Sequence, residues 1–272
     1  MLKNKKSYIY GYDIETMPNL VRTWGKWEQN VIWYERYGYI WSISGAEYVS
    51  GKPNKIVHKN ITDFPLYKKD KYSDEALVRW IWEQFDKAPA ILAHNGDSFD
   101  SKMLVSRFVH YGLPAPSPYK QIDTKKLFKR YLREDSNSLD DIIKKHWTQI
   151  QKIAKERGID ISNSAGKVNT GGYGLWQGAE NGDPKSIRRM KIYNNYDVTG
   201  LFLAYFLILP YVTNHPNLNV LNGDNTSCPN CGSHTIQKRG FGLNSKSKYQ
   251  RLHCQDCSAW FKGENIKCIQ KK

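Results

Sequence analysis

The first sixty residues carry their hydrophobic positions in short runs rich in aromatic and β-branched side chains, a pattern typical of β-strands. These runs predict three or four strands, at residues 8–14, 20–24, 37–49 and 54–59. The spacing of the hydrophobic positions then changes. In SDEALVRWIWEQF, from Ser73 to Phe85, apolar residues recur every three or four positions, which predicts an amphipathic helix capped by Ser73.

The rest of the chain alternates between strand-like and helix-like segments. Buried strands are predicted at 90–94 and 119–124, and helices at 98–110, 124–133, 138–147 and 184–208, with Asp123 as the N-cap of the second helix. Strands followed by βα alternation predict an α/β fold, a mixed sheet with helices on its faces. The polar, glycine-rich segment 148–183 lacks the Gly-Lys-Ser/Thr of a phosphate loop and is predicted to be a flexible loop that could act as a lid.

The longest apolar run, LFLAYFLILPYV at 201–212, is predicted to be a buried helix end. It is shorter than the roughly 20 residues of a membrane span and contains Pro210. The basic start MLKNKK is followed by tyrosines and an aspartate, so no apolar core of a secretory signal is present. We therefore expect a protein that stays inside the cell and has no membrane partner.

The charge of the chain points to a polyanionic partner. Lysine and arginine number 41 against 26 acidic residues, a formal net charge of +15 in 272 residues. Nucleic acid is the simplest partner for such an excess, and a merely soluble basic protein is the alternative. The length exceeds that of a typical domain of about 100–200 residues and favours one large core with a small appendage.

All five cysteines lie between 228 and 268, which indicates a separate C-terminal module. The preceding stretch is rich in Asn, Gly and Pro without helical periodicity, as expected of a linker. We therefore predict a large domain at 1–213, a linker at 214–227 and a small domain at 228–272. The small domain is the more basic, with nine lysines and arginines against two acidic residues.

CPNC and CQDC form two Cys-x-x-Cys pairs separated by 22 residues, which is close to the spacing of a zinc ribbon. Disulfides are disfavoured in an intracellular chain. Four thiolates would close the coordination shell of one structural Zn²⁺ and leave no position for chemistry. The predicted ligands are Cys228, Cys231, Cys254 and Cys257, with Cys268 as a spare thiol.

Basic and aromatic residues are mixed between and after these cysteine pairs, a composition suited to phosphates and stacked bases. Nucleic-acid binding is favoured over protein docking for this module. Phe241 and Trp260 could instead fill the small ribbon core. The residues in question are Lys238, Arg239, Phe241, Lys246, Lys248, Tyr249, Arg251, Trp260 and Phe261.

Asp13 and Glu15 lie two apart in the first predicted strand, so their side chains project on the same side. Two such carboxylates repel each other unless they share a proton, meet an Arg or Lys, or bind a divalent metal. The alternative is that both acids belong to a solvated strand end.

Two further acids could reach the same site. Asp100 lies in the first turn of a predicted helix, where it would also interact favourably with the helix N-terminus. Asp197 follows Tyr193 by four residues, so both share one face of the helix at 184–208, unless Asp197 lies on its solvated flank. Four carboxylates and a phenol are what a two-metal phosphodiesterase requires.

DIE at 13–15, HNGDSFD at 94–100 and YNNYD at 193–197 resemble the three motifs of the DnaQ-like superfamily, the DEDD 3′–5′ exonucleases of ribonuclease H-like fold. Tyr193 resembles the tyrosine subclass, and the position at which the other subclass has His is Ile192. By this resemblance Tyr193 orients the attacking water and Asn95, which matches the second motif with Phe99, contacts the 3′-terminal nucleotide. The implied ligands of two Mg²⁺ or Mn²⁺ are Asp13, Glu15, Asp100 and Asp197.

The chain also resembles bacteriophage and bacterial ribonuclease H-like nucleases with a C-terminal zinc ribbon. This resemblance implies a 3′–5′ exonuclease acting on single strands or 3′ ends, with DNA favoured. It further implies the cytoplasm of a bacterial or phage-infected cell and a replication or repair protein as partner. A structure-specific endonuclease or ribonuclease on the same site stays open, as does a nucleic-acid-binding protein with an inactive site.

Overall fold

The computed structural model describes residues 8–27, 30–49, 51–161, 172–245 and 247–267. A mixed five-stranded sheet forms its centre, in the order β5-β4-β1-β6-β7. This confirms the predicted α/β fold. The central strand β1 pairs antiparallel with β4 and parallel with β6, while β5 pairs antiparallel with β4 and β7 pairs parallel with β6. The strands are β1 (Ile9–Met17), β4 (Tyr39–Tyr48), β5 (Val57–Asn60), β6 (Ala90–Ala93) and β7 (Lys120–Asp123).

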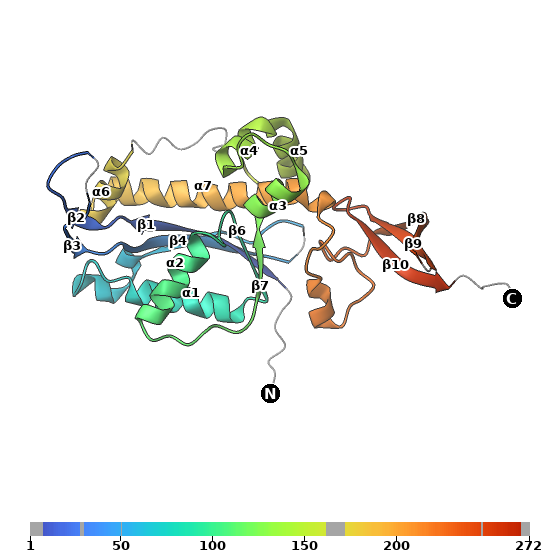
Figure 1. Cartoon of the computed structure of the whole chain (residues 1–272), viewed down its shortest axis with the longest axis horizontal. Helices are drawn as coiled ribbons and strands as arrows, with labels where there is room; N and C mark the ends of the chain where they lie inside the picture. Colours follow the sequence, from blue (N-terminus) through green and yellow to red (C-terminus); the bar gives the residue numbers. More distant parts are fainter. Residues whose placement is uncertain (1–7, 28–29, 50, 162–171, 246, 268–272) are drawn as a thin grey trace.

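Helices cover both faces of this sheet (Figure 1). Helix α7 (Pro184–Ile208) runs along one face, and α1 (Glu75–Lys87) and α2 (Asp100–His110) lie on the other. The covered strands β1 and β4 are therefore buried along almost their whole length. Burial on both faces explains why these strands read as nearly continuous hydrophobic runs.

The alternation of β1 divides its side chains between the two layers. Tyr10 and Tyr12 pack in the apolar cluster that includes Phe85 of α1, while Ile9 packs in the cluster that includes Phe202 of α7. Gly11 is required on the α7 side, because a Cβ there would lie 2.4 Å from the Phe202 ring. The glycine therefore lets α7 approach β1 closely, beside the position of the predicted acids.

Helix α1 begins one residue later than predicted. Asp74 occupies the N-cap position, and Ser73 Oγ accepts only a long 3.4 Å hydrogen bond from the Glu75 amide. The Asp74 side chain is turned inward, where it accepts from the Ile40 amide at 2.8 Å and forms an ion pair with Arg107. Asp74 therefore joins α1 to β4 and α2 and does not cap its own helix.

The remaining helices of the large domain lie around α7. They are α3 (Thr124–Tyr131), α4 (Leu139–Lys145), α5 (Trp147–Arg157) and α6 (Gly174–Glu180), with short 3₁₀ helices at Ile61–Asp63, Pro65–Lys68, Leu209–Tyr211 and Leu218–Asn222. The prediction of a flexible loop over 148–183 is wrong for the described part of that segment, because most of α5 and all of α6 lie there. Residues 162–171 lie outside the described residues. Ile150 and Ala154 of α5 pack on Leu203 of α7.

A separate two-stranded hairpin lies beyond the end of β1. Strand β2 (Leu20–Arg22) pairs antiparallel with β3 (Trp33–Arg36), with a register shift between Leu20 and Val21. The sequence predicts a strand at 20–24 but none at 33–36. Figure 1 shows this hairpin and α6 together at one end of the molecule, opposite the C-terminal strands.

The C-terminal module is a three-stranded sheet in the order β10-β9-β8. It consists of β8 (Ile236–Leu243), β9 (Ser247–Cys254) and β10 (Trp260–Lys267). Asn230 joins it to the end of α7, because its amide donates to the carbonyls of Leu209 at 3.1 Å and Val212 at 3.0 Å. The division into 1–213, 214–227 and 228–272 stays a prediction.

The apolar run at the end of α7 is largely buried, as the sequence predicts for a helix end, although Tyr211 near its end is exposed. Among the described residues, no helix is both long and apolar enough to cross a membrane.

Candidate active site

Three of the predicted acids converge between β1 and α7. Asp13 and Glu15 extend from β1 toward the helix, and Asp197 extends from α7 toward the strand. Each offers a carboxylate oxygen, and these oxygens all lie within 4.8 Å of one another. Asp13 and Asp197 are half-buried and Glu15 is buried. The same-face spacing in the strand therefore places Asp13 and Glu15 together, as the sequence predicts.

Asp100, the fourth predicted acid, lies at the start of α2 and is buried. It is not among the three acids whose oxygens lie within 4.8 Å, but its charge raises the pKa of both Asp13 and Glu15. Hydrogen bonds to its carboxylate from the backbone of Asp100 itself and of Ile14 in β1 act to lower the pKa of Asp100 and so favour its ionised form. Asp100 is therefore a negative charge held beside β1, close enough to interact with the acids there.

Burial and mutual repulsion make the ionised site unfavourable without a cation. Burial, followed by Asp197, Glu15 and Asp100, raises the pKa of Asp13 well above its usual value. The same causes, burial and the charges of Asp197 and Asp100, raise the pKa of Glu15 to about 8, and burial raises that of Asp100 to about 6. A divalent cation would reverse this balance. The all-oxygen donor set fits a hard cation such as Mg²⁺ or Mn²⁺.

Tyr193 lies one helical turn before Asp197 and forms a hydrogen bond with its carboxylate. Burial and then the charges of Asp197, Glu15 and Asp13 raise the pKa of this phenol. Tyr193 therefore remains protonated near neutral pH, and its hydroxyl can orient a water molecule but not serve as a base.

Asn194 is a site residue that the sequence analysis missed. Its side-chain amide donates to Asp13 Oδ2 at 2.6 Å and to the Asp13 carbonyl at 3.1 Å, while its Oδ1 accepts from Ser42 Oγ at 3.4 Å. Asn194 is completely buried. The available signal was its position three residues before Asp197, which places it near the same face of the helix.

Trp176 of α6 is a second residue that was missed. Its side chain forms a hydrogen bond with Glu15, which favours the ionised carboxylate. Its ring also meets the ring of Tyr193 edge to face, with centroids 6.2 Å apart. Because α6 lies in the segment predicted as a loop, no periodic pattern indicated that Trp176 would reach the acids.

Asn95 and Phe99 lie in the turn between β6 and α2. Asn95 has a left-handed backbone with φ of 68°. Asp123 holds this turn, because its carboxylate accepts from the amides of Asn95 at 3.0 Å and Asp97 at 3.2 Å. Asp123 also caps α3, as predicted, by accepting from the Lys126 amide. Phe99 is exposed beside Asp100, and the nucleotide contacts of Asn95 and Phe99 stay a prediction.

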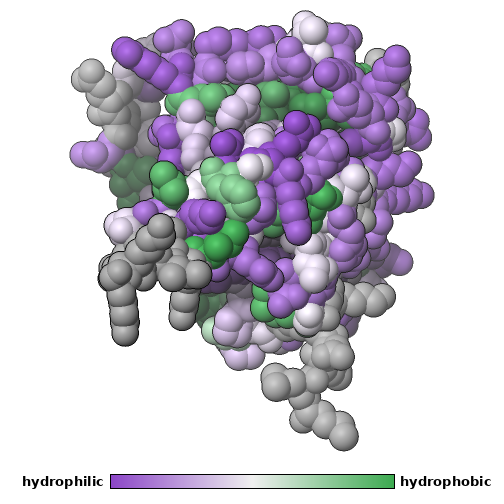
Figure 2. Space-filling model, turned by 90° about the vertical axis from the view of Figure 1, so that its right-hand side faces the viewer, coloured by the Kyte–Doolittle hydropathy of each residue, from purple (hydrophilic) through white to green (hydrophobic). Residues whose placement is uncertain are grey.

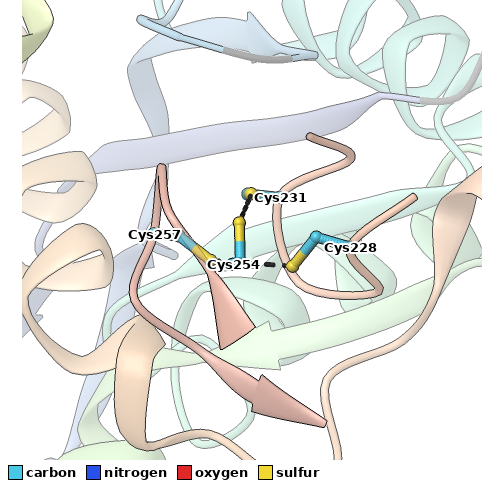
Figure 3. Close-up of side chains that lie close together, drawn as sticks. All are labelled: Cys228, Cys231, Cys254 and Cys257. Carbon is cyan, nitrogen blue, oxygen red and sulfur yellow. Dashed lines mark hydrogen bonds between the residues drawn. The ribbon is translucent and has the colours of Figure 1, made fainter. Parts of the chain in front are cut away.

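The four cysteines of the two Cys-x-x-Cys pairs form a second candidate metal site. Their side chains point toward one another from the ribbon (Figure 3), with Sγ–Sγ distances of 3.7 Å for Cys228–Cys257 and 3.6 Å for Cys231–Cys254. These distances exclude disulfides, whose S–S length is about 2.05 Å. A tetrahedral Zn²⁺ with Zn–S bonds of about 2.3 Å requires S–S edges of about 3.8 Å. The geometry therefore fits one zinc ion. Cys268 lies outside the described residues.

The raised pKa values predict how the stability of the metal-free protein depends on pH. Glu15 binds its proton up to a pH of about 8 in the folded chain, but only up to the ordinary Glu value of 4.5 when unfolded. The contribution of Glu15 to the free energy of unfolding should therefore be fully present below pH 4.5. It should fall by up to about 1.4 kcal/mol per pH unit as the pH rises toward 8, and other carboxyls with raised pKa values should add to this loss. We expect the Tm in a chelator to fall over this range.

Melting curves with and without Mn²⁺ measure this effect. Added Mn²⁺ should raise the Tm more at pH 8 than at pH 6, because metal binds the deprotonated ligands. Glu15→Gln is the control variant and should flatten the curve recorded in chelator. A wild-type Tm that follows the variant's at every pH would contradict the prediction.

Comparisons with known proteins match most of the chain to one family. The model of a family described as predicted 3′-5′ exonucleases related to the exonuclease domain of PolB matches residues 42–218, a segment that includes Asp100, Tyr193 and Asp197. A family B DNA polymerase from the hyperthermophilic archaeon Pyrobaculum calidifontis aligns structurally with 11% identity and a TM-score of 0.46 over 88% of this chain. The chain spans only 31% of that polymerase.

No curated protein matches. The matched segment makes up well over half of the chain, which therefore belongs to the family of predicted 3′–5′ exonucleases related to the exonuclease domain of PolB.

Proposed function

We propose that this protein is a metal-dependent 3′–5′ exonuclease that hydrolyses phosphodiester bonds of nucleic acid, with DNA favoured, by a two-metal-ion mechanism. The observation that carries the proposal is the convergence of Asp13, Glu15 and Asp197 within 4.8 Å, with Asp100 and Tyr193 coupled to them. Such a group of buried like charges is costly unless cations bind there. The family membership supports a nuclease.

Each side chain has a proposed role. The four acids hold two Mg²⁺ or Mn²⁺ ions, which when bound supply a hydroxide nucleophile at neutral pH and neutralise charge on the attacking and leaving oxygens. Asn194 fixes the orientation of Asp13, and Trp176 that of Glu15, so that both ligands are preorganised. The protonated Tyr193 orients the attacking water. Asn95 and Phe99 contact the 3′-terminal nucleotide.

The C-terminal module is proposed to be a zinc ribbon that adds affinity for nucleic acid. Cations lie over aromatic rings along its strands, with Lys248 over Phe241 at 5.0 Å, Arg251 over Trp260 at 4.8 Å and Lys262 over Tyr249 at 4.9 Å. Both Phe241 and Trp260 are exposed, which favours a surface role over the core role. Figure 2 shows this end of the molecule, where hydrophilic residues surround smaller hydrophobic patches.

Salt dependence tests the ribbon. The variant Lys248→Ala/Arg251→Ala/Lys262→Ala should weaken binding to a single strand at low salt and reduce the slope of log Kd against log salt by about 2, since each phosphate contact contributes about 0.7. Fluorescence anisotropy measures both. Arg79→Ala/Lys87→Ala on α1 is the control and should leave the slope unchanged. An unaltered slope in the ribbon variant would instead favour protein docking.

The overall proposal is tested with matched 5′-labelled DNA and RNA, single-stranded and double-stranded, incubated with Mn²⁺. A ladder that shortens from the 3′ end supports the exonuclease and identifies its substrate. Discrete internal cuts at a fold or branch would identify a structure-specific endonuclease or ribonuclease instead. Binding without cleavage would identify a nucleic-acid-binding protein with an inactive site. A replication or repair partner, and the cytoplasm of a bacterial or phage-infected cell, stay predictions.

A further inference from the structure

The hairpin beyond β1 carries an unusual concentration of exposed aromatic side chains. We call the described residues 20–27 and 30–37 the aromatic hairpin. The exposed fractions are 88% for Trp24, 75% for Trp27 and 66% for Trp33, and Tyr34 and Tyr37 are exposed as well. Large exposed rings in one place mark an interaction surface, because they leave apolar area in water.

The aromatic hairpin is tied to the candidate active site through α6. Arg36 forms an ion pair with Glu180 of α6, and the Tyr39 hydroxyl donates to the same carboxylate at 3.1 Å. The same helix carries Trp176, which forms a hydrogen bond with Glu15. Helix α6 therefore contacts the base of the hairpin and a proposed metal ligand, and fixes one relative to the other.

The path along the chain from the acids to the hairpin is also short. Leu20, the first residue of β2, follows Glu15 by five residues, and at about 3.3 Å per extended residue this spans no more than about 17 Å. The aromatic hairpin thus begins a few nucleotide lengths from the acids. The hairpin is therefore close to the site that is proposed to receive a nucleic-acid end.

Ring geometry and charge favour a nucleic-acid strand as the occupant. Tyr34 and Tyr37 stack with centroids 4.8 Å apart and planes 17° apart, and Lys26 lies 5.1 Å from the centroid of the Trp27 ring. Glu35 is paired with Arg22, so its charge is neutralised within the hairpin. Exposed rings next to cations are the usual means of binding unpaired bases.

We propose that the aromatic hairpin stacks against bases of an unpaired strand, a few nucleotides from the end held at the carboxylates. The inference rests on the proposed function and deepens it, because it assigns a base-stacking surface outside the carboxylate site. Bases in an intact duplex are already stacked on their neighbours and offer no free faces to the rings. The hairpin therefore favours single strands over duplexes.

The test compares two triple variants of the full-length protein. Trp24→Ala/Trp27→Ala/Trp33→Ala removes the rings, and Trp24→Phe/Trp27→Phe/Trp33→Phe keeps smaller ones. All three positions are exposed, so the fold should persist. The Kd for a fluorescein-labelled 15-nucleotide single strand and for its blunt duplex is measured by anisotropy with Ca²⁺. Hydrolysis of the p-nitrophenyl ester of thymidine 5′-monophosphate, which is too small to reach the hairpin, is measured with Mn²⁺.

The Ala variant should bind the single strand about tenfold more weakly or worse, since each stacked base contributes about 1–3 kcal/mol. The Phe variant should lose much less, and duplex binding and ester hydrolysis should stay unchanged. Tyr211→Ala, at an exposed ring outside the hairpin, should have no effect. An unchanged single-strand Kd in the Ala variant overturns the inference and leaves the hairpin as a protein-docking surface. Lost ester hydrolysis also overturns it, because the rings would then support the acids themselves.

Failure of the proposed function has a different signature. It would appear as wild-type protein that hydrolyses neither the ester nor the strand. The Kd comparison would still decide whether the hairpin binds bases.

Discussion

Replacing Asp13 by Asn should abolish nuclease activity without destabilising the metal-free protein. Asp13 is held by Asn194 and surrounded by three other acids, so the substitution removes one of four mutually repelling charges and keeps an oxygen that can accept the 2.6 Å hydrogen bond. Metal ions supply several kcal/mol of transition-state stabilisation, and each 1.36 kcal/mol corresponds to tenfold in rate. We expect cleavage to fall by about three orders of magnitude or more.

Two measurements separate this functional effect from a loss of structure. Cleavage of a 5′-labelled single strand is followed with Mn²⁺, and the Tm is recorded in chelator at pH 8, where the Asn variant should equal or exceed the wild type. Asp140→Asn is the control, because that acid pairs with Lys144 on α4 outside the site. Retained cleavage by the Asp13 variant would show that the metal site lies elsewhere.

The second large effect is expected at the ribbon. Cys254→Ser should abolish zinc binding and lower the main thermal transition of the whole chain. All four cysteines pack in the same apolar cluster as Tyr48 of the central sheet and Phe206 of α7. Structural zinc contributes roughly 10–16 kcal/mol of apparent binding energy in zinc-finger peptides. Even a loss of about 4 kcal/mol would lower the Tm of a chain of this size by about 8–16 °C.

Calorimetry and a zinc-release assay measure both parts of this prediction. Wild-type protein should contain one zinc ion per chain and the Ser variant none. Cys268→Ser, outside the two Cys-x-x-Cys pairs, is the matched control and should keep both the metal and the Tm. A main transition that stays in place while a small separate transition is lost would contradict the prediction. It would mean that the ribbon folds independently of the large domain, on the far side of the linker predicted at 214–227.

The sequence predicts the sheet and the acidic group because both depend on local spacing. Strands β1, β4 and β6 are buried on both faces, so their residues read as clear hydrophobic runs. The geometry of Asp13 and Glu15 follows from the two-residue period of a strand, and that of Tyr193 and Asp197 from one helical turn. Convergence of β1 with α7 required the resemblance, since no local pattern indicates which helix covers which strand.

The parts that the sequence analysis missed depend on long-range contacts. Helix α5 buries only Ile150 and Ala154, too few apolar positions to form a convincing period, and it is held by the contact with Leu203 of α7. Trp176 reaches Glu15 from a helix that has no more than two buried residues of its own. Strand β3 of the hairpin buries almost none of its side chains, so it lacks the alternation of buried and exposed positions that would have predicted it.

Helix α7 sets the distance between the two ends of the molecule. It carries Asp197 near its middle, and the 3₁₀ turn that follows it offers the Leu209 carbonyl to Asn230 of the ribbon. Twelve residues separate Asp197 from Leu209, which at 1.5 Å per residue is about 18 Å of rigid rod. At about 3.4 Å per stacked nucleotide, a strand would need roughly five nucleotides merely to cover that rod. If the acids and the ribbon bind one strand, as proposed, the helix sets a minimum substrate length for simultaneous contact with both, and shorter products would leave one of the two free.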